Sequence, residues 1–274
     1  MKIFDSEKLL KTAEKLHPQY VKAEPFPHIA IDNFMDEQLL DQALAVFPKP
    51  EALDFYRYNN PLEKKLAYDQ VANLPDPIAN ILHAMNQPVF LRFLEVLTGI
   101  DGLIADPYYR GGGIHQIPKG GKLDVHIDFN KYNKLNLDRR LNALIYLNKD
   151  WKESYGGHFE LWRGKKIDEN HHEVTDCVEK VLPIFNRFVV FSTSEHSYHG
   201  HPEPISCPEG WTRKSLATYY YTAGRPAEED APAHSTIFIK RPADPEDADI
   251  ADLRMKRNKG RLSSNVKSTF VADK

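Results

Sequence analysis

From residue 105 to residue 224 the sequence is a succession of short apolar runs separated by turn residues. Gly-Gly pairs at 120–121 and 156–157 are typical of such turns. The runs that we expect to form strands are residues 114–117, 123–128, 140–147, 158–162, 186–192 and 214–221. Many short strands at this spacing predict a sandwich, jelly roll or barrel rather than a parallel α/β sheet.

Three segments of the first hundred residues have apolar residues at helical spacing, namely 6–22, 35–47 and 78–97. Gly99 follows the third segment at the position where a C-terminal cap is expected. Residues 25–34 alternate like a strand, and their prolines suit an edge strand. The Tyr-rich segment 51–70 matches neither pattern, so we expect a loop there.

These patterns predict a mainly β chain with N-terminal helices, organised in three parts. Residues 1–104 are expected to form a helical scaffold that is integrated with the β core of residues 105–224. Pro, Asp and Lys accumulate in residues 225–274, which resemble a C-terminal extension or tail.

The composition argues against several classes of function. A formal net charge of −3 gives no general attraction to nucleic acid or to an anionic membrane. The N-terminus lacks the apolar core of a signal peptide, and no run approaches the roughly 18 apolar residues of a membrane span. Two cysteines, Cys177 and Cys207, favour idle thiols in a reducing compartment. We therefore expect a cytoplasmic protein that binds neither nucleic acid nor membrane.

His126 and Asp128 are the most informative polar pair of the predicted strands. Side chains two residues apart on a strand point to the same face, so both can reach one metal ion. Imidazole and carboxylate together suit Fe(II), Mn(II) or Zn(II). Three other pairs carry the same ligand atoms, but none precedes a second histidine at a comparable separation and a later strand-borne arginine: His158-x-Glu160, His171-x-Glu173 and His201-x-Glu203.

The third ligand is expected from residues 195–201, which contain His196, His199 and His201. His199 is preferred because it lies between an aromatic residue and a glycine, and the other two histidines remain alternatives. Two imidazoles and one carboxylate occupy one face of an octahedral ferrous ion and leave positions open for other ligands.

With these residues, the chain resembles a 2-oxoglutarate/Fe(II)-dependent dioxygenase of the prolyl 4-hydroxylase-like group. The similarity spans roughly residues 105–222, and residues 26–47 resemble the N-terminal segment of many bacterial members. The motifs that carry it are Leu-Ile-Tyr-Leu-Asn-Lys-Asp-Trp at 144–151, the Gly-Gly pair at 156–157, Phe-Val-Val-Phe at 188–191 and Thr-Arg-Lys-Ser at 212–215. The family fold is a double-stranded β-helix, a jelly-roll or cupin-like core, which agrees with the strand pattern.

The resemblance implies that His126, Asp128 and His199 hold the iron and form the catalytic centre. It also implies that Arg213 and Tyr146 bind the distal carboxylate of 2-oxoglutarate. The planar guanidinium group of arginine suits this role because it can meet both carboxylate oxygens.

The chain departs from the family pattern in two places. Segment 200–212 is longer than in compact members and contains three prolines; we expect it to form a loop near the site entrance, and it keeps His201 open as a ligand. Gln116 stands where some members have a tyrosine, so Gln116 or His115 is expected to contact co-substrate or substrate. Phe159 is expected either to pack on the co-substrate or to belong to the core.

The implied reaction is hydroxylation of an unactivated C–H bond with Fe(II), 2-oxoglutarate and O₂, with ascorbate as a candidate reductant. The resemblance suggests a prolyl residue in a protein or peptide as the substrate, and a free amino acid or other small metabolite is the alternative. Residues 55–60 and 129–139 are expected either to line a substrate cleft or to be solvated loops. A metal-binding cupin-like domain without turnover, and a structural or interaction domain, are the alternatives outside the enzymes.

Overall fold

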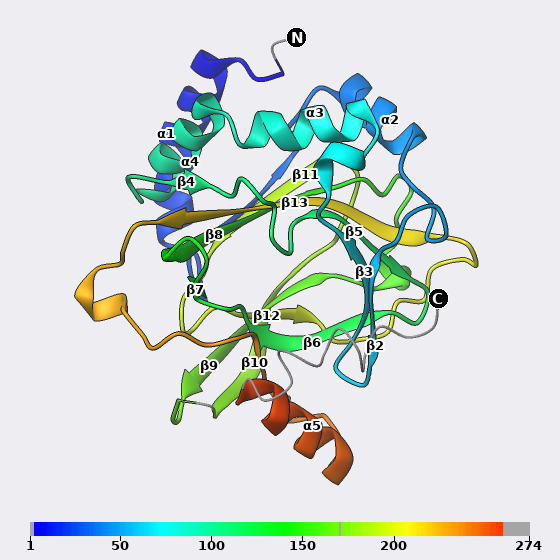
Figure 1. The fold of residues 1–274 in the computed structure, drawn as a ribbon, viewed down its shortest axis with the longest axis vertical. Coiled ribbons are helices and arrows are strands. Elements are labelled where there is room, and N and C mark those ends of the chain that lie inside the picture. The colour runs from blue at the N-terminus through cyan, green and yellow to red at the C-terminus, as the bar shows by residue number, and fades with distance from the viewer. Residues whose placement is uncertain (1–2, 170, 260–274) are drawn as a thin grey trace.

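A single antiparallel sheet, curled into a nearly closed barrel, dominates the computed structural model (Figure 1), which describes residues 3–169 and 171–259. The helices of this part of the chain are α1 (Ser6–Val21), α2 (Glu37–Ala45), α3 (Asp76–Met85), α4 (Pro88–Thr98) and α5 (Ala248–Asn258). Its strands are β1 (His28–Asp32), β2 (Tyr56–Asn60), β3 (Glu63–Tyr68), β4 (Ile104–Ala105), β5 (Gly113–Pro118), β6 (Lys122–Ile127), β7 (Lys131–Tyr132), β8 (Leu137–Tyr146), β9 (Phe159–Lys166), β10 (His172–Val181), β11 (Arg187–Ser192), β12 (Tyr198–His201), β13 (Thr212–Thr222) and β14 (Ile237–Phe238).

The strands pair in the order β1-β11-β8-β13-β5-β3-β6-β12-β9-β10, so most neighbours in the sheet, except β9 and β10, are not consecutive in the sequence. The two halves of this order face each other across the barrel interior (Figure 1). This is the double-stranded β-helix that the strand pattern and the family resemblance predict, and the prediction is confirmed.

Alternation along the central strands produces two separate apolar cores. In β8, Leu141, Ala143 and Ile145 pack in the core beneath the helices, whereas Leu144 and Tyr146 pack in the core inside the barrel. Successive side chains of a strand point to opposite faces, so one strand can serve both cores. The inner core leaves polar side chains of the same face free to form a site.

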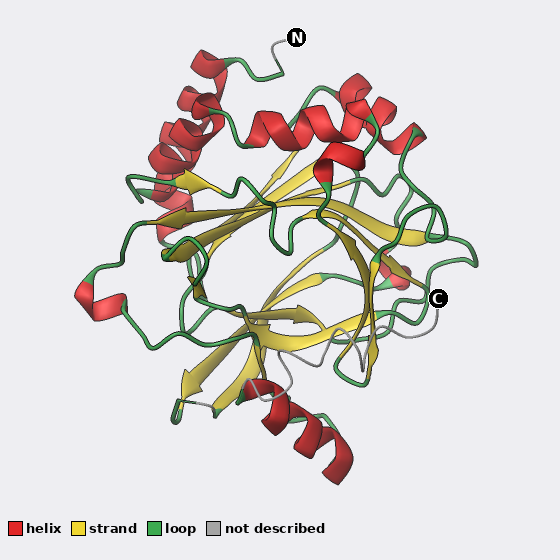
Figure 2. Cartoon of the chain, viewed as in Figure 1, coloured by secondary structure: helices red, strands yellow, loops and turns green. Residues whose placement is uncertain are grey.

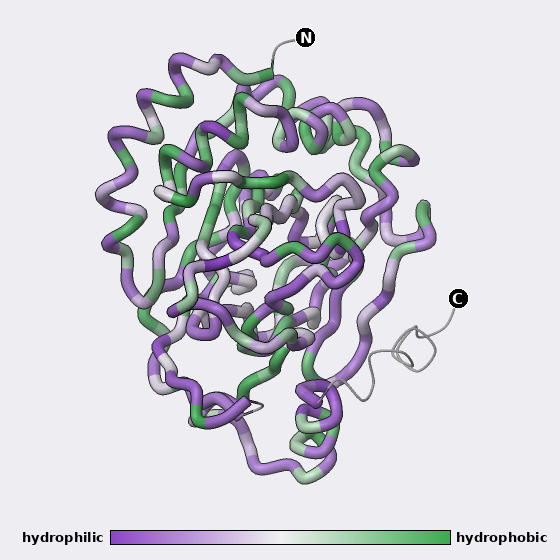
Figure 3. The backbone as a smooth tube through the Cα atoms, turned by 60° about the vertical axis from the view of Figure 1, so that its left-hand side comes forward, coloured by the Kyte–Doolittle hydropathy of each residue, from purple (hydrophilic) through white to green (hydrophobic). Residues whose placement is uncertain are grey.

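Helices α1 to α4 cover the outer face of the β1-β11-β8-β13-β5 half (Figure 2). Hydrophilic and hydrophobic residues alternate along these helices, as expected of helices with one face on the sheet (Figure 3). A group of phenylalanines joins the two layers, and Phe34 stacks on Phe188 of β11 with ring centroids 4.2 Å apart. No helix among the described residues is long and apolar enough to cross a membrane.

Two N-terminal predictions differ from the structure. The segment expected as one helix at 78–97 forms two helices, because Pro88 cannot continue α3 but suits the first position of α4. The loop expected at 51–70 is wrong, since β2 and β3 form a hairpin there. Its turn is fixed by Asn60, whose side-chain oxygen accepts hydrogen bonds from the backbone N–H groups of Leu62 and Glu63.

The C-terminal extension is attached to the core up to the end of α5. Strand β14 pairs with β6, where Phe238 lies opposite His126 and Ile237 opposite Ile127. The side chain of Asn258 accepts a hydrogen bond from the backbone N–H of Phe238 and donates one to its carbonyl. Helix α5 is mainly hydrophilic (Figure 3), and its composition therefore resembles that of a tail. Polar contacts hold it against the core. Residues 260–274 of the predicted tail lie outside the described residues.

Glu195 joins three segments near the start of β12. Its carboxylate accepts hydrogen bonds from Lys166 of β9 at 2.6 Å and from His234 of the C-terminal extension at 2.7 Å. Burial raises the pKa of Glu195, but these two partners outweigh burial and lower the pKa to about 2. The ionised carboxylate therefore stabilises the fold.

We expect Glu195→Gln to lower the free energy of unfolding at pH 7 by about 2 kcal/mol. Because the pKa of Glu195 is depressed in the folded state, its contribution is present above the unfolded pKa of about 4.3 and is lost as the pH falls towards 2. Denaturant unfolding between pH 3 and pH 7 measures this difference, with Glu173→Gln, an exposed ion-pair partner of Lys165, as the control. An equal loss at both pH values would contradict the assignment.

Candidate metal and co-substrate site

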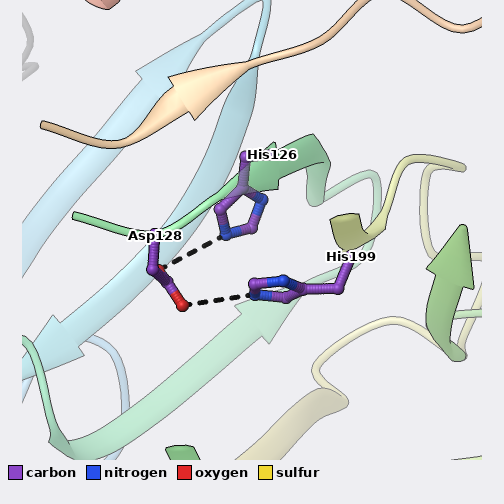
Figure 4. A group of neighbouring side chains, drawn as sticks. All are labelled: His126, Asp128 and His199. Carbon is purple, nitrogen blue, oxygen red and sulfur yellow. Dashed lines mark ion pairs between the residues drawn. The ribbon is translucent and has the colours of Figure 1, made fainter. Parts of the chain in front are cut away.

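His126, Asp128 and His199 form a compact group inside the barrel (Figure 4). One ligand atom of each lies within 4.8 Å of the others, and the structure offers no second group of this kind among residues 3–169 and 171–259. His126 Nε2 lies 3.7 Å from Asp128 Oδ1, and His199 Nε2 lies 3.4 Å from Asp128 Oδ2. Pairing of β6 with β12 produces this geometry because His126 and His199 are direct cross-strand partners.

Both histidines are oriented by the same backbone device. The Nδ1 of His126 bonds to the carbonyl of Asp124, and the Nδ1 of His199 bonds to the carbonyl of Ser197, each at 2.8 Å. A carbonyl only accepts hydrogen bonds, so Nδ1 carries the proton and Nε2 keeps its lone pair for a metal. Burial and the neighbouring His199 lower the pKa of His126 to about 3, which keeps that ring neutral. The donor set therefore fits Fe(II).

Asp128 is held by two buried polar side chains of β8. Asn142 donates a hydrogen bond to Asp128 Oδ2 at 2.7 Å, and Arg139 Nη2 lies 3.2 Å from the same oxygen. Arg139 also bonds to Asn142 and lies over the ring of Tyr219, 3.8 Å from its centroid. Burial raises the pKa of Asp128, but the guanidinium of Arg139 outweighs burial and holds that pKa well below its ordinary value.

Arg213 and Tyr146 meet at another wall of the same interior. Arg213 Nη2 donates to the Tyr146 hydroxyl at 3.1 Å, and Arg213 Nε donates to the Gly157 carbonyl at 2.7 Å. A Cβ at Gly157 would lie 3.0 Å from the Arg213 side chain, so the Gly-Gly turn makes room for the guanidinium group. A cavity of about 100 Å³ is lined by these two residues and by the three of the metal group.

A wider cleft of about 450 Å³ opens from the metal group between the β2–β3 hairpin and the C-terminal extension. Aromatic and cationic side chains predominate in its walls, among them Tyr56, Tyr58, Lys65, Phe129, Arg139, Phe238 and Arg257. Arg257 of α5 pairs with Glu63 of β3 at 2.9 Å, which ties two walls of the cleft together. The extension is thus part of the site.

The structure places the three histidines that the sequence leaves open as third ligand at different distances from His126 and Asp128. It brings His199 rather than His201 to His126 and Asp128, and His196 is exposed. The rival His-x-Glu pairs form no such group, and His158 instead bonds to Glu153.

The structure also shows where three residues expected near the co-substrate lie, namely His115, Gln116 and Phe159. His115 lines the cavity, whereas Gln116 bonds to Pro48 and Thr212 outside it. Phe159 lines the cavity and also packs in the inner core, and packing on the co-substrate stays a prediction.

Segment 200–212 forms the expected loop between β12 and β13, but residues 202–212 do not line the entrance of the site. Ile205 is buried against Ile117 and Trp151, and it exchanges backbone hydrogen bonds with the Gly120-Gly121 turn. Residues 202–212 line neither the cavity nor the cleft, and Ile205 and Cys207 of this segment are buried in a separate small core. Burial of the apolar side chains in this segment explains the difference.

The predicted cleft segments contribute only in part. Tyr56, Arg57 and Tyr58 line the cleft, as do Phe129 and Arg139. The other charged residues of segment 129–139 and Arg140 face elsewhere, where Lys131 pairs with Asp230, Lys134 lies over Tyr108 and Arg140 pairs with Glu229.

Residues 112–221 match the family model of the 2OG-Fe(II) oxygenase superfamily. These residues are thus similar to the oxygenases of that superfamily. The matched range contains the complete metal group together with Tyr146 and Arg213. The resemblance stated from the motifs is therefore confirmed.

The chain is also similar to a curated prolyl hydroxylase. Prolyl 3-hydroxylase OGFOD1 of Mus musculus is 25% identical over 209 residues, which cover 72% of this chain and 33% of the mouse protein. The chain thus spans about a third of the length of that relative.

Solved structures support the fold. A prolyl-4-hydroxylase of Pseudomonas putida superimposes with a TM-score of 0.50 at 16% identity, over 77% of this chain and 100% of the other. A prolyl 4-hydroxylase of Phytophthora capsici superimposes with a TM-score of 0.51 at 18% identity, over 95% of this chain and 79% of the other.

The sequence interpretation missed Asn142 as a functional residue. A signal was present, because Asn142 is a polar residue at the position where strand alternation places it on the same face as Leu144 and Tyr146. A buried amide on an apolar face has a hydrogen-bond partner in most proteins, and here the partner is Asp128.

We expect Asn142→Leu to weaken Fe(II) or Mn(II) binding about tenfold to a hundredfold, because Asp128 loses the donor that orients it. Anaerobic calorimetric titration of the metal-free protein measures this affinity. Gln116→Leu is the matched control, since it removes a buried amide outside the cavity and should leave the metal affinity unchanged. Native affinity in the Asn142 variant would contradict a role in holding Asp128.

Proposed function

We propose that this chain is a 2-oxoglutarate- and Fe(II)-dependent dioxygenase that hydroxylates an unactivated C–H bond of a prolyl residue in a protein or peptide. One observation carries the proposal. The metal group of His126, Asp128 and His199 shares a buried cavity with the Arg213–Tyr146 pair. A metal-binding site and an anchor for a carboxylate in one cavity are what a chelating 2-oxo diacid requires.

Each side chain has a distinct role in this proposal. The two imidazoles and Asp128 would hold Fe(II), which supplies the oxidation of the C–H bond by O₂ once 2-oxoglutarate is bound. Arg213 would neutralise the distal carboxylate in a cavity where few waters can do so. Tyr146 accepts a hydrogen bond from Arg213, so its own proton is available to the same carboxylate. Burial raises the pKa of Tyr146, which keeps that proton in place.

The shape of the cleft supports a substrate larger than a free amino acid. Its volume of about 450 Å³ and its aromatic walls offer apolar contact to a proline ring and to neighbouring residues of a peptide. The prolyl hydroxylases among the relatives support the same substrate class, with a free amino acid or small metabolite as the alternative. Two free cysteines support a reducing compartment, and a cytoplasmic location is part of the proposal.

We expect the native protein to form succinate from 2-oxoglutarate under air with Fe(II) and ascorbate, and we expect His126→Ala and Arg213→Ala to lose this turnover. His126→Ala removes a metal ligand, and Arg213→Ala leaves a buried carboxylate without its counter-charge. His158→Ala, which alters a rival His-x-Glu pair, is the control and should keep full activity. Succinate release is followed first without substrate and then with prolyl peptides and free proline.

Absence of succinate formation, together with absence of a 2-oxoglutarate-dependent Fe(II) absorption band in the anaerobic native protein, would contradict the proposed enzyme. A peptide that raises turnover more than free proline does would support the substrate class.

A further inference from the structure

One buried side chain of the co-substrate cavity has no partner. His201 of β12 is 5% exposed and lines the cavity together with His199, Tyr146 and Arg213. Neither of its ring nitrogens has a hydrogen-bond partner among the residues that the structure describes. His126 and His199, in contrast, each bond to a backbone carbonyl.

Such an arrangement is costly unless a ligand completes it. A buried polar group left without a hydrogen bond costs about 1–3 kcal/mol, and most buried side chains avoid this. An imidazole always has at least one N–H to donate. The charges that act most strongly on His201 are those of Arg213 and Lys65, and both are positive. A hydrogen-bond donor under the influence of two cations in this cavity matches an anionic acceptor.

The position of His201 on β12 indicates which end of an anionic ligand it would contact. Its Cα partner is Leu123, whereas His199 pairs with His126 at the metal, so β12 leads away from the metal group. Two strand residues advance roughly 6.6 Å. His201 is therefore displaced from the metal ligands towards the part of the cavity governed by Arg213.

We propose that His201 is a third binding residue for the distal carboxylate of 2-oxoglutarate and donates an N–H hydrogen bond to it beside Arg213 and Tyr146. The inference rests on the proposed function, which assigns that cavity to the co-substrate. It adds a residue that the sequence interpretation considered only as an alternative metal ligand.

Equilibrium binding of two acids tests the proposal without turnover. The anaerobic Fe(II) protein is titrated with 2-oxoglutarate and with 2-oxovalerate, which has the same chain length but a methyl group in place of the distal carboxylate. We expect His201→Phe to weaken 2-oxoglutarate binding about tenfold to a hundredfold, as expected for loss of a hydrogen bond to a charged group. Binding of 2-oxovalerate should not change.

Two further variants make the result specific. His201→Gln keeps an N–H donor and should recover part of the affinity for 2-oxoglutarate, and it also serves if the phenylalanine variant does not fold. His172→Phe is the matched control, because His172 is also 5% exposed with an unpartnered Nε2 but lies outside the cavity. It should bind both acids like the native protein.

The outcomes separate the inference from the proposed function. Native affinity for 2-oxoglutarate in His201→Phe, or an equal loss for both acids, would overturn the role of His201 and leave the dioxygenase proposal standing. Failure of the native protein to bind 2-oxoglutarate would overturn both. A loss confined to 2-oxoglutarate, with partial recovery in His201→Gln, is the result that we expect.

Discussion

The pairing of β6 with β12 is the interaction on which the site depends. It sets His126 directly opposite His199 and brings their ring centroids to 4.3 Å. A shift of one residue in this register would turn one imidazole to the other face of the sheet. Gly200 follows His199, and a Cβ there would lie 2.8 Å from the carbonyl oxygen of Leu123, so the two strands can approach only with glycine at this position.

Charged and polar side chains hold the site residues that strand pairing brings together. Asp128 is a partly buried carboxylate, and it remains ionised because Arg139 lies beside it and Asn142 donates a hydrogen bond to it. Removing one partner of such a buried arrangement costs more than the arrangement itself contributes to stability, since an uncompensated charge remains. The same reasoning links Arg213 to the carboxylate proposed for its cavity. The barrel interior thus consists of paired charges enclosed by an apolar core.

The sequence predicts the parts of the molecule in which burial leaves a strong pattern. Strands β5, β6, β8, β11 and β13 have apolar residues on one or both faces, and the prediction located all of them. The ligand group was predictable because side chains on one strand two residues apart share a face, and His199 followed from its neighbours. The hairpin of β2 and β3 was not predictable, because its Tyr, Asn and Lys side chains serve a cleft wall rather than a core. Helix α5 was missed because polar contacts from Asn258 and Arg257 replace an apolar stripe.

Strand β14 comes late in the chain, and this affects how the strand that bears His126 is completed during folding. The strand that bears His126 precedes its neighbour Phe238 by most of the barrel sequence, so a nascent chain presents this strand with one edge unpaired. Pairings between residues distant in sequence form late and slowly. A chain without β14 would leave the backbone of this strand unpaired beside His126, and an unpaired strand edge is a template for association with other chains. Completion of the C-terminal extension closes that edge and protects the strand from misassembly.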